Sequence, residues 1–317
     1  MRNKVLILGA AGFIGTNLTL RLLLEKKQLV LFDRREAQFD PKVCEAVRQG
    51  KAEFLTGQFL EDNWKMQANL LREVDMVYHL VSTTCPTNSN QDAAREMEEN
   101  VIATMHFLDA CVEHGVRKVI FLSSGGTVYG KEHTGICKEE EEAFPITVYG
   151  VQKLTIEKIL YLYWQMHGLD YRIVRLSNPY GPYQRPNGIQ GVVTTFTWKA
   201  LHDEPILVYG DGSVVRDYIY IDDAVEGILR IAEQQGNHRL YNLGSGRGRT
   251  VDEVIQTIAR VLQKQMKVSY QSSRAVDVPV NVLDVSRFKQ DFGGFLPIEL
   301  EEGIQRLASF FKEQDRC

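Results

Sequence analysis

A tyrosine and a lysine four residues apart, Tyr149 and Lys153, have the spacing to place a phenol beside an ammonium group. On a helix this spacing puts both side chains on one face, one turn apart. The usual pKa of tyrosine, about 10, is too high for a base at neutral pH, but a neighbouring cation favours the phenolate. The pair therefore predicts a tyrosine that takes up and returns a proton.

A glycine-rich segment near the start of the chain has the pattern of a phosphate-binding turn. Gly9 permits a tight turn after an apolar run, Gly12 lets the backbone approach a pyrophosphate, and Gly15 lets a helix pack closely on a sheet. The first residues of that helix, Phe13 and Ile14, point free N–H groups at the phosphates. The segment predicts a dinucleotide site.

An acidic residue, Asp33, ends the second apolar run and is placed to accept hydrogen bonds from the adenosine ribose. A carboxylate there repels a 2′-phosphate, and this favours NAD over NADP. Arg34 and Arg35 beside it argue in the other direction, because arginine can accommodate a 2′-phosphate. Together with the tyrosine–lysine pair, this predicts a nicotinamide-dependent enzyme whose acid/base is Tyr149.

A loop rich in hydroxyl groups, residues 123–130, follows the apolar run Lys118–Leu122. Loops at the carboxyl ends of parallel strands are where doubly wound sheets bind ligands. A hydroxyl from this loop can orient the reacting hydroxyl of a substrate.

The totals describe an ordinary globular chain of 317 residues with 44% apolar and 25% charged residues and a net charge of −4. That charge gives no indication of nucleic acid or an anionic membrane as a partner. An apolar run begins at Lys4 and no run reaches membrane-spanning length, so we expect no signal peptide and a cytoplasmic location. The five scattered cysteines are expected to be reduced, and no His/Cys cluster has metal spacing, so no metal site is expected.

Short apolar runs alternate with helical patterns in the first half of the chain, and this alternation predicts an α/β fold with a doubly wound parallel sheet of the Rossmann type. The strands are expected at Lys4–Leu8, Leu29–Phe32, Glu53–Leu55, Met76–Leu80, Lys118–Leu122 and Tyr171–Leu176, with clear helices at Phe13–Glu25, Ala93–His114 and Tyr149–Met166.

The pattern changes after Ser177, where a turn-rich segment is followed by irregular stretches and helices. We therefore predict an NAD-binding domain over residues 1–176 and a smaller α/β substrate-binding lobe over 177–317, some segments of which return to the first domain. Helices of the lobe are expected at Gly191–His202, Asp223–Gln235, Val251–Gln263 and Glu299–Glu313.

With these motifs in place, the chain resembles the extended short-chain dehydrogenases/reductases of the nucleotide-sugar epimerase/dehydratase family, and most closely the UDP-glucose 4-epimerase branch. The resemblance covers nearly the whole chain, and the motifs in the second half make it specific. They are Gly9–Gly15, Asp33, His79–Ser82, Asn100, Ser123–Gly130, Tyr149 with Lys153, Asn178–Pro182, Gly210–Gly212, Arg216–Asp223, Tyr241–Gly246 and Arg274–Asp277.

The resemblance implies that NAD takes a hydride from C4 of a UDP-sugar while the tyrosine removes the 4-hydroxyl proton, and that the hydride returns to the other face of the transient 4-keto sugar. It also implies that Asn178, Arg216 and Arg274 contact the nucleotide diphosphate and that Asp277 helps bind the uridine ribose. Further contacts are implied to the cofactor from Leu80, Ser82 and Asn100, and to the substrate from Thr84 and Val192.

One position departs from the family pattern: the slot of the catalytic serine or threonine holds Gly125. The resemblance therefore leaves either Ser124 or Thr127 to supply the hydroxyl that orients the reacting group of the sugar. Related 4,6-dehydratases carry an Asp-Glu pair in this loop and related decarboxylases a glutamate, whereas this chain has Gly126 and Thr127. The loop lacks a group for a second acid/base step, which favours epimerisation over both reactions.

The sequence leaves the sugar open. Asn281 stands where some family members have a bulky tyrosine, and we hypothesise that it leaves room for an N-acetyl group. Thr127 and Arg185 are instead placed to meet the carboxylate of a uronic acid. The resemblance also implies a homodimer, built through a four-helix bundle from Ala93–His114 and Tyr149–Met166, and a pathway of surface polysaccharide or galactose metabolism.

Two other classes compete with a 4-epimerase. One is a dehydratase or reductase of the same fold that releases a keto or reduced sugar. The other is a non-catalytic nucleotide-binding protein, which the intact Tyr149 and Lys153 disfavour and Gly125 weakly favours.

Overall fold

The computed structural model describes residues 4–25, 27–60, 64–85, 89–132, 135–186, 191–273 and 278–316. The chain forms two compact units, each described here by itself. The first comprises Met1–Ser123, Thr147–Val174 and His238–Leu240, and the second comprises Ser124–Ile146, Arg175–Asn237 and Tyr241–Cys317. The division differs in detail from the predicted boundary at residue 176. Residues 124–146 lie in the second unit, where the short strand β6 (Ile136–Cys137) pairs with β14 (Val280–Leu283).

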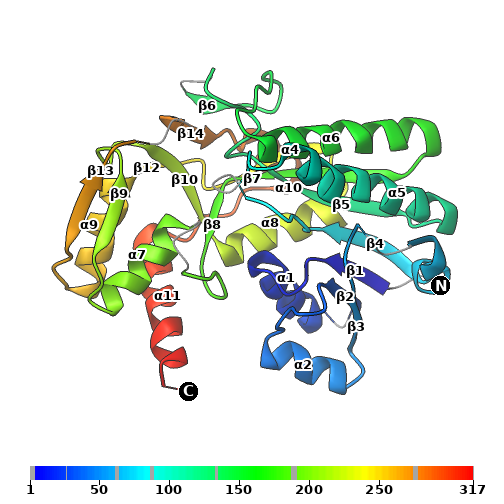
Figure 1. The fold of residues 1–317 in the computed structure, drawn as a ribbon, viewed down its shortest axis with the longest axis horizontal. Helices are drawn as coiled ribbons and strands as arrows, with labels where there is room; N and C mark the ends of the chain where they lie inside the picture. Colours follow the sequence, from blue (N-terminus) through cyan, green and yellow to red (C-terminus); the bar gives the residue numbers. More distant parts are fainter. Residues whose placement is uncertain are drawn as a thin grey trace. The chain divides into compact units, whose positions relative to one another are not determined.

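A seven-stranded sheet in the order β11-β7-β5-β4-β1-β2-β3 underlies the first unit (Figure 1). The pairings β3–β2, β2–β1, β1–β4 and β4–β5 are all parallel, so the carboxyl ends of these strands lie at one edge. The chain order reverses between β1 and β4, and ligands of doubly wound sheets bind at such a switch point. The strands are β1 (Lys4–Leu8), β2 (Gln28–Asp33), β3 (Ala52–Thr56), β4 (Val74–His79), β5 (Lys118–Ser124), β7 (Asp170–Leu176) and β11 (Leu240–Leu243).

The predicted strands and helices of this half of the chain are confirmed, with small shifts at their ends. The helices are α1 (Phe13–Leu24), α2 (Pro41–Arg48), α3 (Ala68–Leu71), α4 (Ala93–Met97), α5 (Ala103–His114) and α6 (Val148–His167), with a 3₁₀ turn η1 (Trp64–Gln67) and a π-helical turn η2 (Glu98–Ile102). The helix predicted over Ala93–His114 is therefore three segments. Just after the π-helical turn, the Thr104 hydroxyl donates to the Asn100 carbonyl four residues earlier, and such side-chain bonds often bend helices.

Aromatic side chains form the centre of the core beneath β4 and β5. Phe32 lies 5.0 Å from Trp64, centroid to centroid, and Trp64 lies 4.9 Å from Phe107. The ring of Phe121 packs edge-on against His79 at 5.4 Å. All five are buried, so the strand ends that carry the predicted site rest on a closely packed base.

The second unit is built on smaller sheets. One has the order β12-β10-β14-β6, with β8 also paired to β10, and the other pairs β13 with β9. The four predicted helices of the lobe are confirmed as α7, α8, α9 and α11. The elements are β8 (Asn178–Tyr180), β9 (Ile206–Tyr209), β10 (Val215–Tyr220), β12 (Gly248–Thr250), β13 (Val268–Gln271), α7 (Val192–Leu201), α8 (Ile221–Glu233), α9 (Val251–Leu262), α10 (Ser286–Phe292) and α11 (Leu300–Gln314).

None of the helices in the described ranges has the length and apolar character that crossing a membrane requires.

Candidate active site

The glycine turn after β1 packs so closely that Gly9 and Gly15 have no room for a side chain. Gly9 has a φ of +85°, and a Cβ there would lie 3.2 Å from the backbone of Leu80 and Val81 at the end of β4. A Cβ on Gly15 would lie 2.1 Å from the Gly9 carbonyl oxygen. The turn thus presents bare backbone before helix α1, which is the arrangement that a pyrophosphate needs.

Asp33, at the end of β2, lies directly beside this turn. Its Oδ2 accepts from the Ala11 amide at 2.8 Å, and its Oδ1 accepts from the Arg34 amide at 2.8 Å. The first turn of α1 carries no acidic residue to oppose its positive end. The predicted pyrophosphate and ribose positions therefore adjoin one another, and the residues fit a dinucleotide.

The segment after β4 brings the predicted residues Ser82, Thr84 and Asn100 together. Ser82 Oγ donates to the Thr84 carbonyl at 2.9 Å. The side-chain amide of the buried Asn100 bonds Thr83 at both ends. Asn100 Oδ1 accepts from the Thr83 backbone amide at 3.0 Å, and Asn100 Nδ2 donates to the Thr83 hydroxyl at 2.8 Å. Asn100 therefore holds this segment in place, in addition to the cofactor contact that the resemblance implies.

Tyr149 and Lys153 lie on the first turns of α6, as predicted. The Lys153 Nζ is 5.6 Å from the centroid of the Tyr149 ring and 4.8 Å from that of Phe121. It also donates to the Leu122 carbonyl at 2.9 Å, which anchors it to the end of β5. Burial lowers the pKa of Lys153 to about 8. The structure thus places the Lys153 amino group, whose pKa is lowered and whose position is fixed by Leu122, next to the Tyr149 ring.

Glu157 is part of this arrangement and was missed in the sequence. It lies one helical turn beyond Lys153, is buried, and accepts from the Ser123 hydroxyl at 2.5 Å. Its charge raises the pKa of Lys153 against the larger effect of burial. The signal was available, because Lys153 and Glu157 repeat the four-residue spacing of Tyr149 and Lys153.

His79, at the end of β4, is buried in its neutral form beside the site. Its Nε2 lies 2.9 Å from the Thr104 hydroxyl. Burial, aided by the charge of Lys153, lowers the pKa of His79 to about 3.

The low pKa of His79 makes stability depend on pH. Below about pH 6.5 the unfolded chain binds a proton at this histidine that the folded chain does not, so stability falls as the pH drops towards 3. Between pH 8 and pH 5 we expect about 2 kcal/mol of the unfolding free energy to be lost through this group. Urea unfolding at both pH values should show a smaller loss for His79→Gln, whereas His106→Gln, at an exposed histidine, should behave as the wild type. Equal losses in all three proteins would contradict the assignment.

In the second unit, the structure explains why the slot at 125 holds glycine. A Cβ on Gly125 would lie 2.5 Å from the Leu283 side chain and 3.2 Å from the Arg175 carbonyl oxygen. Leu283 is fully buried. A side chain at 125 would therefore point into the core of this unit, which leaves Ser124 and Thr127 as the predicted sources of the hydroxyl.

These two hydroxyls differ in their surroundings. A Cβ on Gly126 would lie 3.9 Å from both Ser124 Oγ and Asn178 Oδ1, so these two polar atoms flank the same point. Thr127 Oγ1 is enclosed and has no hydrogen-bond partner among the described residues. Ser124 and the predicted diphosphate contact Asn178 therefore lie together, with the bare backbone of Gly126 between them.

Other predicted substrate residues lie on neighbouring strands of this unit. Arg216, on β10, donates to the Val278 carbonyl at 2.6 Å and is paired in register with Asn281 on β14. Asn281 is 1% exposed and donates to the Gly125 carbonyl at 3.0 Å, so it ties β14 to the hydroxyl loop. Val192 begins α7. Arg274 and Asp277 lie outside the described residues.

Asp217 was not singled out from the sequence but is central to this part of the unit. It is fully buried and accepts from the Ser245 amide at 2.8 Å, the Ser245 hydroxyl at 2.6 Å and the Gly246 amide at 3.1 Å. It thereby pins the turn after β11 to β10, next to Arg216. The acidic residue within the motif after Arg216 was the available signal.

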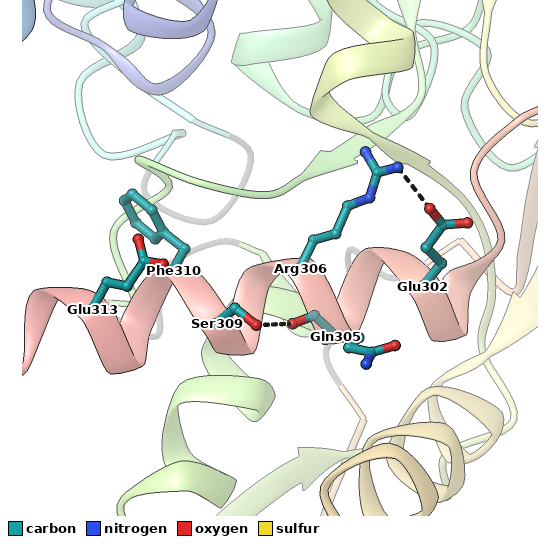
Figure 2. A pocket seen from close by; sticks show the side chains of 6 residues that line it. All are labelled: Glu302, Gln305, Arg306, Ser309, Phe310 and Glu313. Atoms are coloured by element: carbon teal, nitrogen blue, oxygen red, sulfur yellow. Dashed lines mark hydrogen bonds and ion pairs between the residues drawn. The ribbon is translucent and has the colours of Figure 1, made fainter.

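A pocket lies along α11 (Figure 2), and one of its lining residues, Arg306, also contacts Asp222 at 3.4 Å. Its lining residues all belong to that helix, where Arg306 bonds Glu302 at 2.6 Å and Ser309 bonds the Gln305 carbonyl at 3.0 Å. It contains no predicted site residue. Within the described ranges, no three His, Cys, Asp or Glu residues are grouped as a metal site would require.

The chain is similar to known proteins over nearly its whole length. Residues 5–244 match the model of the NAD dependent epimerase/dehydratase family. The chain is 33% identical over 309 residues to the dTDP-4-dehydro-6-deoxyglucose reductase of Escherichia coli, which covers 96% of each chain.

Solved structures of similar proteins cover almost the whole chain. The UDP-glucose 4-epimerase of Thermotoga maritima with UDP-glucose has a TM-score of 0.89 at 30% identity, covering 98% of this chain and 99% of that one. That of Thermus thermophilus in complex with NAD has a TM-score of 0.87 at 29% identity, with the same coverage. Other relatives are UDP-glucuronate and UDP-N-acetylglucosamine 4-epimerases, decarboxylases and a dehydratase.

Proposed function

Because this chain belongs to the NAD-dependent epimerase/dehydratase family and is an NAD-dependent enzyme of that family, we propose that it interconverts the C4 epimers of a UDP-sugar. The observation that carries the proposal is the Tyr149–Lys153 pair, combined with a loop over residues 123–130 that holds hydroxyls and no carboxylate. A dehydratase or decarboxylase needs a further acid/base group, whereas epimerisation needs only one proton to be taken up and returned.

Each residue then has a distinct task. Tyr149 takes the proton of the 4-hydroxyl, and the amine of Lys153 favours the phenolate form of Tyr149. Bound at the glycine turn and Asp33, NAD would supply a reversible acceptor for the hydride of C4. After the 4-keto sugar has rotated to present its other face, Tyr149 returns the proton to the oxygen, so no net oxidation takes place.

A reductase is the second candidate, and one observation favours it. The similarity to the E. coli dTDP-4-dehydro-6-deoxyglucose reductase, at 33% identity, is as strong as that to the solved epimerases. A reductase of this fold uses the same tyrosine to give a proton to a keto oxygen, but it consumes one reduced cofactor for each sugar.

The deciding experiment is NMR of the purified protein, without added cofactor, with UDP-glucose, UDP-galactose, UDP-N-acetylglucosamine and UDP-glucuronate in turn. The proposal predicts that the C4 epimer forms with one of them. If all four fail both without and with added NAD, and a 4-keto-6-deoxy sugar nucleotide instead consumes NADH or NADPH in equal amounts, the protein is a reductase.

The sugar itself is a separate proposal. Asn281 is smaller than tyrosine, and this supports an N-acetylhexosamine, whereas the exposed Arg185 is the residue that a uronic acid would need. Relative kcat/KM on UDP-N-acetylglucosamine and UDP-glucose tests the first, and the absence of turnover of the acetylated sugar contradicts it.

We further propose that Ser124, rather than Thr127, orients the sugar hydroxyl, because Ser124 shares its surroundings with Asn178 while the Thr127 hydroxyl is enclosed. Ser124→Ala is expected to lower kcat about a hundredfold, the lower end of the usual contribution of such groups. The nearly isosteric Thr127→Val should change kcat less than about threefold. The reverse order of effects would assign the role to Thr127.

A homodimer is also proposed. Helices α5 and α6 lie side by side in the first unit (Figure 1), and Ile102, Val151, Leu162 and Met166, on η2 and α6, are large exposed apolar side chains. Such side chains on a helix pair favour burial against another chain. Sedimentation should give twice the mass of one chain, and a single-chain mass would contradict the proposal. A role in surface polysaccharide or galactose metabolism is a proposal that depends on the sugar, and a cytoplasmic location is a separate proposal.

A further inference from the structure

The first turn of α6, which carries Tyr149, is held by side chains from a distant part of the same unit. The Val148 amide donates to Asn90 Oδ1 at 2.7 Å, and the Tyr149 amide donates to Ser89 Oγ at 2.7 Å. The cap residue Thr147 accepts from a third amide of the same turn. Free N–H groups at a helix start need partners, and here two of them come from the segment after β4.

Asn90 holds its position in an uncommon backbone conformation. Its φ is +88°, in the left-handed region that residues with a side chain seldom adopt. The Asn90 amide donates to Oε1 of Glu96 at 3.1 Å. Glu96, on α4, therefore fixes the residue that in turn fixes the Val148 amide.

The second oxygen of Glu96 reaches α6 directly. Its Oε2 accepts from the Gln152 Nε2 at 3.0 Å, and Gln152 follows Tyr149 by three residues on the same helix. Glu96 and Gln152 are 5% and 2% exposed, so the bridge is shielded from water. One buried carboxylate thus joins the segment of Ser89 and Asn90 to the turn that bears Tyr149.

We propose that Glu96 is a positioning residue for Tyr149. By bridging Asn90 and Gln152, it sets the orientation of the first turn of α6 and hence the place of the phenol. The catalytic part of this inference rests on the proposed role of Tyr149 in proton transfer, whereas the bridge itself does not.

The bridge makes a specific demand on residue types. Two N–H donors converge on Glu96: the Asn90 backbone amide and the Gln152 side-chain amide. The residue at position 96 must therefore accept one hydrogen bond from each of them. Glu96→Ala leaves both without a partner, and Gln152→Glu brings two carboxylates together. The double exchange, Glu96→Gln with Gln152→Glu, restores the bridge, because the new amide accepts from Asn90 and donates to the new carboxylate.

The kinetic test compares these variants on the sugar that the wild type turns over. Glu96→Ala and Gln152→Glu should lower kcat about ten- to a hundredfold, since a misplaced reacting group costs that much, while KM and bound NAD change less than about twofold. The double exchange should recover kcat to within about threefold. Glu98→Ala, at an exposed glutamate two residues further on, is the matched control and should behave as the wild type.

A second readout needs no turnover. Hydrogen exchange of the peptide that contains Val148 and Tyr149 should be about tenfold faster in Glu96→Ala and return to the wild-type rate in the double exchange. If Glu96→Ala does not fold, Asn90→Gly replaces it, since glycine keeps the left-handed conformation but removes the acceptor of the Val148 amide.

The outcomes separate the two proposals. Unchanged exchange in the single variants overturns the bridge, and faster exchange with unchanged kcat overturns the positioning role. A double exchange that is no more active than the single variants also overturns it. If the wild type turns over none of the sugars, the proposed function fails, while hydrogen exchange still reports whether the bridge holds the helix.

Discussion

Replacing Tyr149 with phenylalanine is expected to lower kcat about a thousandfold and to leave the bound NAD in place. The substitution removes only the phenolic oxygen, which is the group that takes and returns the proton of the sugar hydroxyl. Positioned acid/base groups contribute about 10²- to 10⁴-fold to enzymatic rates. Because the glycine turn and Asp33 are untouched, cofactor retention should not change.

The matched control is Tyr161→Phe. Tyr161 lies on the same helix, is 52% exposed, and undergoes the same loss of one oxygen. Turnover is followed by NMR of the sugar, and NAD is quantified after release from the denatured protein. If Tyr149→Phe keeps kcat within about tenfold of the wild type, a group other than Tyr149 transfers the proton.

The second large effect concerns the glycine turn: Gly15→Ala should destabilise the first unit and abolish NAD binding. The added Cβ would lie 2.1 Å from the Gly9 carbonyl oxygen and 2.8 Å from Ala10 Cα. Both are backbone atoms and cannot rotate away as a flexible side chain could. Overpacking of this kind costs about 3 kcal/mol, and here it also shifts the turn that faces the pyrophosphate.

Denaturant unfolding and NAD content of the purified protein measure the two consequences of this substitution. Gly294→Ala is the control, because its Cβ would meet only the side chain of Lys289 at an ordinary contact distance of 3.5 Å. That variant should keep the wild-type stability and NAD content. Wild-type values for Gly15→Ala would mean that the turn is not as closely packed as described.

Features that depend on neighbouring residues could be predicted from the sequence. The glycine spacing, the strand Lys4–Leu8 and the Tyr149–Lys153 pair each depend on a few neighbouring residues. The structure has them where they were expected. The resemblance to the epimerase/dehydratase family and the use of NAD were likewise apparent from the motifs and agree with the comparisons.

Features that depend on distant partners were not apparent in the sequence. The sequence identified Gly125 as a departure from the family pattern, but only the structure shows that Leu283 fills the space which a side chain there would need. It likewise could not show that residues 124–146 join the second unit, since this follows from the pairing of β6 with β14. In both cases the partner lies far along the chain.

The sequence by itself therefore determined the fold class and the cofactor and predicted Tyr149 as the reacting tyrosine, because periodicity and short spacings act locally. Tertiary structure alone decided what surrounds that tyrosine. The carboxylates Glu157 and Glu96 form their hydrogen bonds where folding excludes competing water. The Asn90 side chain reaches the start of α6 only because folding brings two distant segments of the chain together.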